Sequence, residues 1–163
     1  MVFTKISEDD TEPRRWPVSA RQVMIDNRDH GNPFKFTVNF EDVHGRYMDV
    51  CYAELKAISF PKIAGEAYVV MSIDEIPGNL DAISTKTDQA FAIIFFDSQE
   101  MSAGETRAYK GADFYSKKHA LKPVKNIDKL HVTFTKYDGA TLSASDTGGV
   151  VNVSFIIELT CAA

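Results

Sequence analysis

The sequence has few of the residues and patterns that mark common classes of chemistry, and cysteine is the first shortage. Only two cysteines occur among 163 residues, Cys51 and Cys161, and neither belongs to a C-x-x-C pair or to a Cys/His ligand spacing. A structural disulfide or zinc site is not required, because a chain of this length buries about 70% of its unfolded surface on folding. The pattern favours two reduced cysteines of an intracellular protein, and it leaves open whether they pair.

Long hydrophobic runs and clusters of basic charge are missing as well. No segment reaches the roughly 18 consecutive apolar residues of a membrane-spanning helix, and the first residues contain no apolar core of a signal peptide. The formal net charge is −5, and the 18 Lys and Arg residues are scattered, with Arg14-Arg15 and Lys117-Lys118 as the only basic doublets. We therefore expect a soluble protein with no direct membrane span and with no nucleic acid among its partners.

Patterns typical of enzymes are also absent. There is no G-x-S-x-G around a serine, and Gly148-Gly149 precedes a strand-like run, whereas a phosphate-binding loop precedes a helix. The four histidines have no i, i+4 or H-x-H spacing; they are His30, His44, His119 and His131. His119 falls in a lysine-rich stretch that we interpret as a loop, and His131 falls on the solvent side of an expected strand. We expect no catalytic residue, no metal and no cofactor.

One acidic pair needs a separate argument. Asp74 and Glu75 stand side by side at the end of the apolar run "YVVMSI" and just before a Pro-Gly turn. Neighbours on a strand point to opposite faces, so these two carboxylates cannot form the facing pair that acid and base catalysis needs unless the chain bends. We interpret them as polar residues at the rim of a sheet.

Alternation with a period of two is the dominant pattern that is present. In "PFKFTVNFE" four apolar residues, Phe34, Phe36, Val38 and Phe40, alternate with polar ones, which predicts a strand with one buried face. Other strand-like runs share this alternation or are rich in apolar residues; they lie at 18–26, 47–60, 67–76, 91–97, 129–135 and 151–159, with a weaker one near 105–115. The run at 91–97 is nearly continuous in apolar character, which predicts a strand covered on both faces or a strand at the centre of a sandwich.

About eight strands with frequent turns and little helix predict an all-β antiparallel sandwich, and eight is the strand number of a single jelly roll. An immunoglobulin-like sandwich is the rival, but its Cys, Trp, Cys spacing is missing. Helix should be limited to short turns, with residues 113–120 as a candidate. We expect an N-terminal arm at residues 1–17, polar with two prolines, and one jelly-roll domain at residues 18–163.

Four aromatic residues do not fit the regular apolar phase of these strands. They are Trp16 in the arm and Tyr109, Phe114 and Tyr115 in the weakly patterned stretch. Large amphipathic side chains outside a core are typical anchors of protein interfaces. We therefore predict that these four residues contact a neighbouring protein.

The order of the strand-like runs resembles that of single jelly-roll penton and minor capsid proteins of large eukaryotic DNA viruses, the nucleocytoplasmic type. The resemblance covers roughly residues 33–160 and is carried by "SIDEIPGN" and "LHVTFTKYDG". Members of this group have an I-x-E-like strand end with Asn nearby and an L-x-I/V-x-F hairpin followed by Asp-Gly. The length and the missing Gly and Pro signals argue against a double jelly-roll major capsid protein, and the arm lies outside the resemblance.

The resemblance implies a structural protein of the virion without catalysis. It would form the vertex capsomer, as a homopentamer, or serve as a minor capsid protein between capsomers, with the major capsid protein and other minor capsid proteins as partners. Its place would be the capsid, assembled in the host cytoplasm. Jelly rolls also serve other functions. The alternatives are a carbohydrate-binding module, which needs an exposed row of Tyr or Trp on one sheet, and a cupin-type enzyme, which needs two inward histidines near a carboxylate.

Overall fold

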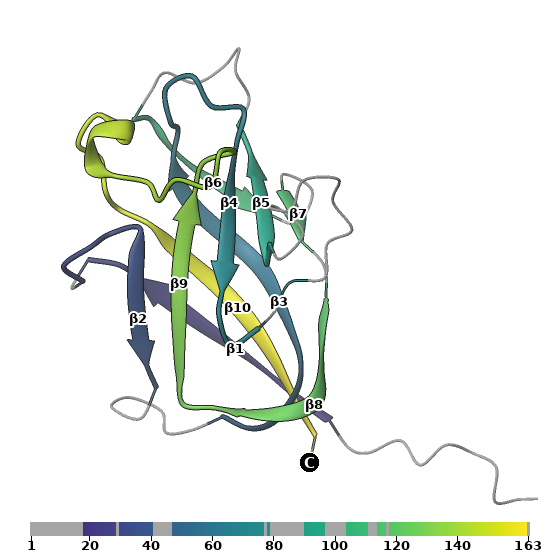
Figure 1. Ribbon diagram of the computed structural model, residues 1–163. Helices are drawn as coiled ribbons and strands as arrows, with labels where there is room; N and C mark the ends of the chain where they lie inside the picture. Colours follow the sequence, from purple (N-terminus) through teal and green to yellow (C-terminus); the bar gives the residue numbers. More distant parts are fainter. Residues whose placement is uncertain are drawn as a thin grey trace, which may run out of the picture.

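A computed structural model of the protein describes residues 18–28, 30–40, 47–76, 78, 90–96, 104–110, 114–116 and 118–162 (Figure 1). Within these ranges the chain forms ten strands and one short 3-10 helix. The strands are β1 (Val18–Asp26), β2 (Lys35–Asn39), β3 (Tyr47–Pro61), β4 (Tyr68–Ile73), β5 (Ala92–Phe95), β6 (Thr106–Lys110), β7 (Phe114–Ser116), β8 (His119–Ile127), β9 (Lys129–Thr135) and β10 (Ser154–Ala162), and the helix is η1 (Ala144–Thr147).

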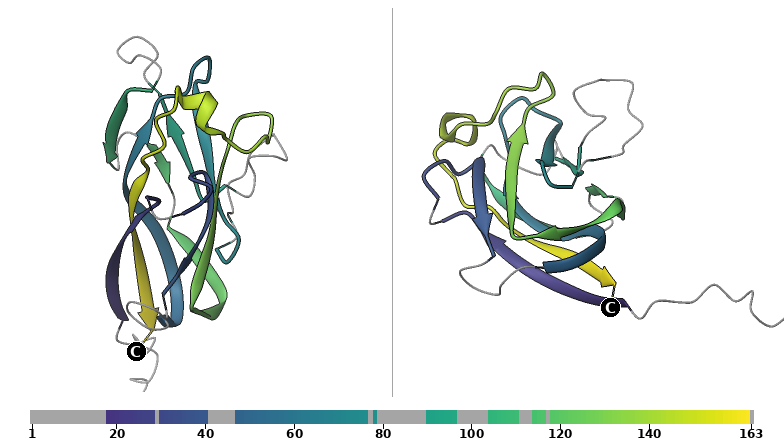
Figure 2. Two further views of the ribbon diagram at one scale, coloured as in Figure 1. Left: turned by 90° about the vertical axis from the view of Figure 1, so that its left-hand side faces the viewer. Right: turned by 60° about the horizontal axis from the view of Figure 1, so that its bottom comes forward.

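The strands form two antiparallel sheets that face each other (Figure 2). Sheet A has the order β1-β10-β3-β6, with β8 also paired to β3, and sheet B has the order β2-β9-β4-β5-β7. When β7 and β8 are set aside and the other eight strands are numbered along the chain, the two orders become 1-8-3-6 and 2-7-4-5. This is the strand order of a jelly roll, so the expected all-β sandwich is confirmed.

The expected alternation is what places the core between the two sheets. Phe36 on β2, Leu130, Val132 and Phe134 on β9, and Phe155 on β10 are buried, while their neighbours along each strand are half-buried or exposed. Phe134 of sheet B lies with its ring centroid 4.9 Å from that of Phe60 and 6.4 Å from that of Phe155, both in sheet A. These rings hold the two layers together by apolar burial and by tilted or edge contacts.

Two local expectations were wrong. Residues 114–116 and 119–127 form strands β7 and β8, so no helical turn lies there; the helical turn is η1, in the small-residue stretch after β9. β8 itself was not anticipated, because Pro123 argues against a central strand. Among the described strands β8 pairs with β3 alone, beyond the stretch of β3 that pairs with β6. For the run at 91–97 the second alternative fits: β5 lies between β4 and β7 in one layer of the sandwich, with Ala92 and Ile94 buried in the core and Phe95 49% exposed.

β1 begins at Val18, which is the first residue of the expected domain. The arm at residues 1–17 lies outside the described residues, so its separation from the domain stays a prediction.

Asp146 in η1 is bound from two sides. Its Oδ2 accepts hydrogen bonds from the backbone N–H of Ser143 at 2.8 Å and from the Ser143 hydroxyl at 2.9 Å, and its Oδ1 accepts one from Lys136 Nζ at 3.0 Å. The backbone hydrogen bond from Ser143, followed by that from Lys136, lowers the pKa of Asp146. The carboxylate therefore ties η1 to the end of β9.

We expect Asp146→Asn to lower the free energy of unfolding by about 1 kcal/mol at neutral pH. Because the folded state lowers the pKa of Asp146, its contribution is complete above the unfolded pKa of about 3.9 and is lost as the pH falls through the folded value. Urea unfolding from about pH 7 to about pH 2 measures this, with Asp74→Asn at an exposed position as the control. A difference between wild type and Asp146→Asn that persists at the lowest pH would contradict the assignment.

Candidate interaction surface

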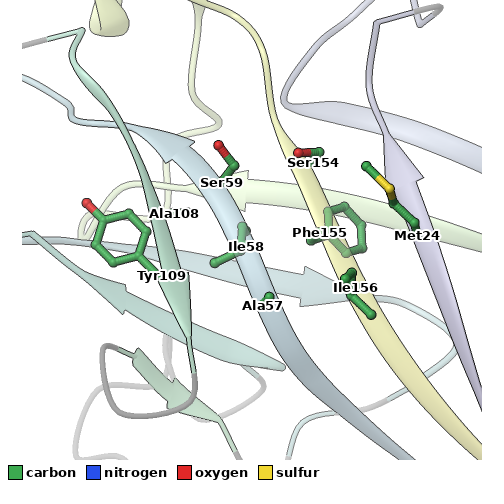
Figure 3. Close-up of a pocket in the computed structure, with 9 residues that line it drawn as sticks. All are labelled: Met24, Ala57, Ile58, Ser59, Ala108, Tyr109, Ser154, Phe155 and Ile156. Carbon is green, nitrogen blue, oxygen red and sulfur yellow. The ribbon is translucent and has the colours of Figure 1, made fainter.

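The outer face of sheet A carries a hollow of about 140 Å³ that crosses four neighbouring strands (Figure 3). Met24 of β1 pairs with Ile156 of β10, which pairs with Ala57 of β3, and one step along the sheet Ser59 pairs with Ala108 of β6. The full lining is Met24, Ala57, Ile58, Ser59, Ala108, Tyr109, Ser154, Phe155 and Ile156.

The hollow exists because small side chains occupy the middle of the face. Around the hollow, side chains along these strands alternate between the core and the outer face, and the outward ones on β3 and β6 are Ala57, Ser59 and Ala108. Met24 stands beside them with 68% of its surface exposed. A contiguous apolar surface that faces water is a typical site of contact with another protein.

A polar row borders the hollow on the same face. Gln22 lies opposite Glu158, which lies opposite Glu54, and Gln22 Nε2 donates a hydrogen bond to Glu158 Oε2 at 3.2 Å. A register shift in the pairing of β3 with β10 makes room for Lys56, whose Nζ lies 2.7 Å from Glu54 Oε2 and 3.5 Å from Glu158 Oε1. The hollow therefore has a charged border, as the rim of a protein interface commonly does.

The pKa values in this row follow from its contacts. The hydrogen bond to Glu54 raises the pKa of Lys56, and the hydrogen bond from Gln22, with smaller help from the charge of Lys56, lowers the pKa of Glu158. These contacts connect the four side chains across β1, β10 and β3. Beyond them, Lys118 Nζ lies 4.7 Å from the ring centroid of Tyr52, which is 39% exposed.

The four residues predicted as interface anchors have different outcomes. Tyr109 is not outside the core: β6 pairs with β3 and turns the ring inward, so that it is 3% exposed and packs edge-on against Phe96 at 6.4 Å. Its position at the base of the hollow had no signal in the sequence. Phe114 and Tyr115 lie on β7, opposite Ile94 and Ile93. Trp16 lies outside the described residues, and contact of these residues with a neighbour stays a prediction.

The acidic pair at the end of β4 is split by the turn. Asp74 is exposed, whereas Glu75 turns back onto β9, where its Oε2 accepts the backbone N–H of His131 at 2.8 Å and its Oε1 contacts the His131 imidazole Nδ1. The Glu75 carbonyl oxygen also accepts a hydrogen bond from Lys125 of β8 at 3.3 Å. The two carboxylates do not face each other. Glu75 instead holds this turn against β8 and β9.

His119, Cys51 and Cys161 are held in structural contacts. His119 is not in a loop: it lies on β8, is 2% exposed, and its Nε2 lies 2.7 Å from the Phe91 carbonyl oxygen. The Cys51 thiol contacts the Thr160 carbonyl oxygen at 3.2 Å, and burial raises the pKa of Cys161. In the part of the chain that the structure describes, no group of three or more His, Cys, Asp or Glu side chains is arranged to hold a metal ion.

The strand order and the outward hollow together describe a jelly-roll sandwich with an apolar hollow on the outer face of sheet A. In comparison with known proteins, neither a protein-family model nor a curated protein matches the chain. Among the described residues no helix has the length and apolar character needed to cross a membrane.

Proposed function

We propose that the protein is a structural component of a viral icosahedral capsid, either the pentameric vertex capsomer or a minor capsid protein that joins neighbouring capsomers. Two things support the proposal: the sequence resemblance carried by "SIDEIPGN" and "LHVTFTKYDG", and the jelly-roll strand order. Because one fold serves many functions, the function is inferred from the surface of the molecule.

The observation that carries it is the apolar hollow on the outer face of sheet A. Fully burying an exposed methionine side chain contributes about 1.5–3 kcal/mol, and Met24, 68% exposed, stands at this hollow. Ile156 stands there too but is already half-buried, so covering it adds less. The hydrogen-bonded row of Gln22, Glu158 and Lys56 beside it supplies a polar border of defined geometry. Such a surface suits permanent contact with another capsid protein better than turnover of a substrate.

We expect Ala108→Lys to weaken this contact at least tenfold, because Ala108 is exposed, lines the hollow and would place an ammonium group in it. Light scattering on a sizing column gives the absolute mass across a dilution series; a wild-type mass near five chains favours the vertex capsomer. If the wild type is a single chain, the same variant is tested for binding to the major capsid protein of the virus that encodes it.

The control is Thr37→Lys, which adds the same charge at an exposed position on β2, in the other sheet. Unchanged association of Ala108→Lys would exclude the hollow as the contact surface. A single-chain mass together with specific binding on a glycan array would contradict the capsid role and favour the carbohydrate-binding module.

A further inference from the structure

The free edge of β1 is the second surface that is open for contact. β1 ends sheet A: its nine residues pair with β10 from Val18 opposite Ala162 to Asp26 opposite Ser154 without a register shift, and among the described strands none pairs with its other side. The unpaired N–H and C=O groups of such an edge form a template for another strand.

β1 lacks the features by which edge strands usually avoid pairing. It contains no proline and no bulge, and its only charged residues are Arg21 and Asp26. Two hollows open along it. One of about 190 Å³ is bordered by Val23 and Ile25 of β1 and by Val38 and Phe40 at the edge of sheet B, and one of about 530 Å³ is lined by residues 21–24 and Tyr47.

The chain itself supplies a segment of matching chemistry. The 17 residues ahead of β1 lead directly into Val18. They include "VFTKIS" at residues 2–7, in which the β-branched Val2, Thr4 and Ile6 alternate with Phe3, Lys5 and Ser7. Such a sequence favours an extended strand. We propose that residues 2–7 of a second copy of this chain add to the free edge of β1 as a further strand of sheet A.

The alternation of side chains along residues 2–7 sets which of them would lie on each side of sheet A, beside the hollows along β1. Added to β1, the segment places every second side chain on the inner side of sheet A, next to Val23 and Ile25 and over the hollow that reaches to Val38. The other side chains lie on the outer side, next to Met24. Backbone hydrogen bonds supply affinity, and the two sets of side chains fix the register.

The connection at residues 8–17 favours a second copy over the segment's own β1. Pro13 and Pro17 cannot donate to a strand ladder, and each biases the residue before it, Glu12 and Trp16, toward an extended conformation. Ten extended residues span about 33 Å, which is about the length of β1. A tight reversal of the chain directly before Val18 is therefore disfavoured, whereas a connection of this length can reach a neighbouring copy. The inference names a partner for the proposed shell component and rests on that function.

The test compares Ile6→Pro with Asp10→Pro in the full chain. Proline at residue 6 removes an N–H from the added strand, whereas proline at residue 10 adds the same ring to the connection. We expect the wild type and Asp10→Pro to associate alike and Ile6→Pro to associate at least tenfold more weakly in light scattering. Hydrogen exchange should slow at least tenfold for amides of β1 when dilute wild type is concentrated, and this change should be lost in Ile6→Pro.

Three results would overturn the inference. The first is association of Ile6→Pro equal to that of the wild type, and the second is a wild type that stays a single chain. The third is protection of β1 amides that does not depend on concentration, because it would indicate pairing within one chain. The contact through the outer hollow is tested separately, by Ala108→Lys. If Ala108→Lys associates normally while Ile6→Pro does not, the outer hollow is excluded and the edge stands; the reverse result excludes the edge and retains the hollow.

Discussion

Asn27→Ala is expected to lower the free energy of unfolding by about 2–4 kcal/mol, because each buried polar group left without a partner costs about 1–3 kcal/mol. Asn27 is 2% exposed and follows the last residue of β1. Its Nδ2 donates to the carbonyl oxygens of Pro33 at 2.8 Å and of Val151 at 2.7 Å, and its Oδ1 accepts the N–H of Val153 at 2.9 Å. One amide thus joins the end of β1 to the segments that enter β2 and β10.

Urea unfolding at neutral pH measures the loss, and Asn152→Ala is the matched control. Asn152 is the same residue type, lies between two of the partners of Asn27, and is exposed. Its replacement should change stability by less than about 0.5 kcal/mol. Equal losses in the two variants would show that the segments around Asn27 hydrogen-bond to water or to each other as well as they do to this side chain.

Asn27 also shows where sequence reasoning stops. The stretch "NRDHGNP" marks a break between strands through its Gly, Pro and Asn residues, and the chain does turn there. Nothing local distinguishes the buried Asn27 from the exposed Asn32 five residues later. The difference lies in contacts with Val151 and Val153, more than 120 residues along the chain, which only the folded sandwich brings together.

The fold was predictable because its signal is local. Alternation at Phe36 and Val38, at Leu130 and Val132, and at Phe155 and Ile157 places one face of each strand in the core, and frequent turns then require two sheets. β8 was missed for an equally local reason, since Pro123 and several lysines obscure the buried His119 and Leu121. It is held in place by pairing with β3, a long-range contact that the local pattern of 119–127 does not encode.

The sequence suggested that a contact surface exists, but it did not identify the residues of the candidate surface. Aromatic residues off the regular phase suggested contact with a neighbour, yet Tyr109 among them is buried, because pairing of β6 with β3 decides its direction. The hollow is instead marked by small residues, Ala57, Ser59 and Ala108, which come from two strands that are about 50 residues apart in sequence. Small side chains have weak strand signals, so their gathering on one face appears only after the register is known.

Gly104→Ala is expected to lower the free energy of unfolding by about 3 kcal/mol. Gly104 has φ +81°, a conformation that costs an L-residue about 1–2 kcal/mol, and an added Cβ would lie 2.9 Å from the backbone carbonyl oxygen of Thr147 in η1. Relieving such overpacking adds about 1–3 kcal/mol. Thr147 is fully buried and its carbonyl oxygen accepts the N–H of Val150 at 3.2 Å, so the clashing atom is held by the chain that leads into β10.

Gly65→Ala separates the two costs, because Gly65 has a similar φ of +76° but no atom within 4 Å of an added Cβ. It should lose only the conformational part, about 1 kcal/mol, and the excess loss in Gly104→Ala measures how firmly η1 is fixed against the turn before β6. Urea unfolding of both variants at neutral pH gives the comparison. Equal losses would mean that η1 moves away from the new methyl group at no cost. In that case the turn would be held against the end of β3 by its two backbone hydrogen bonds alone, from Gly104 N–H to the Lys62 carbonyl oxygen at 2.8 Å and from Lys62 N–H to the Glu105 carbonyl oxygen at 3.0 Å.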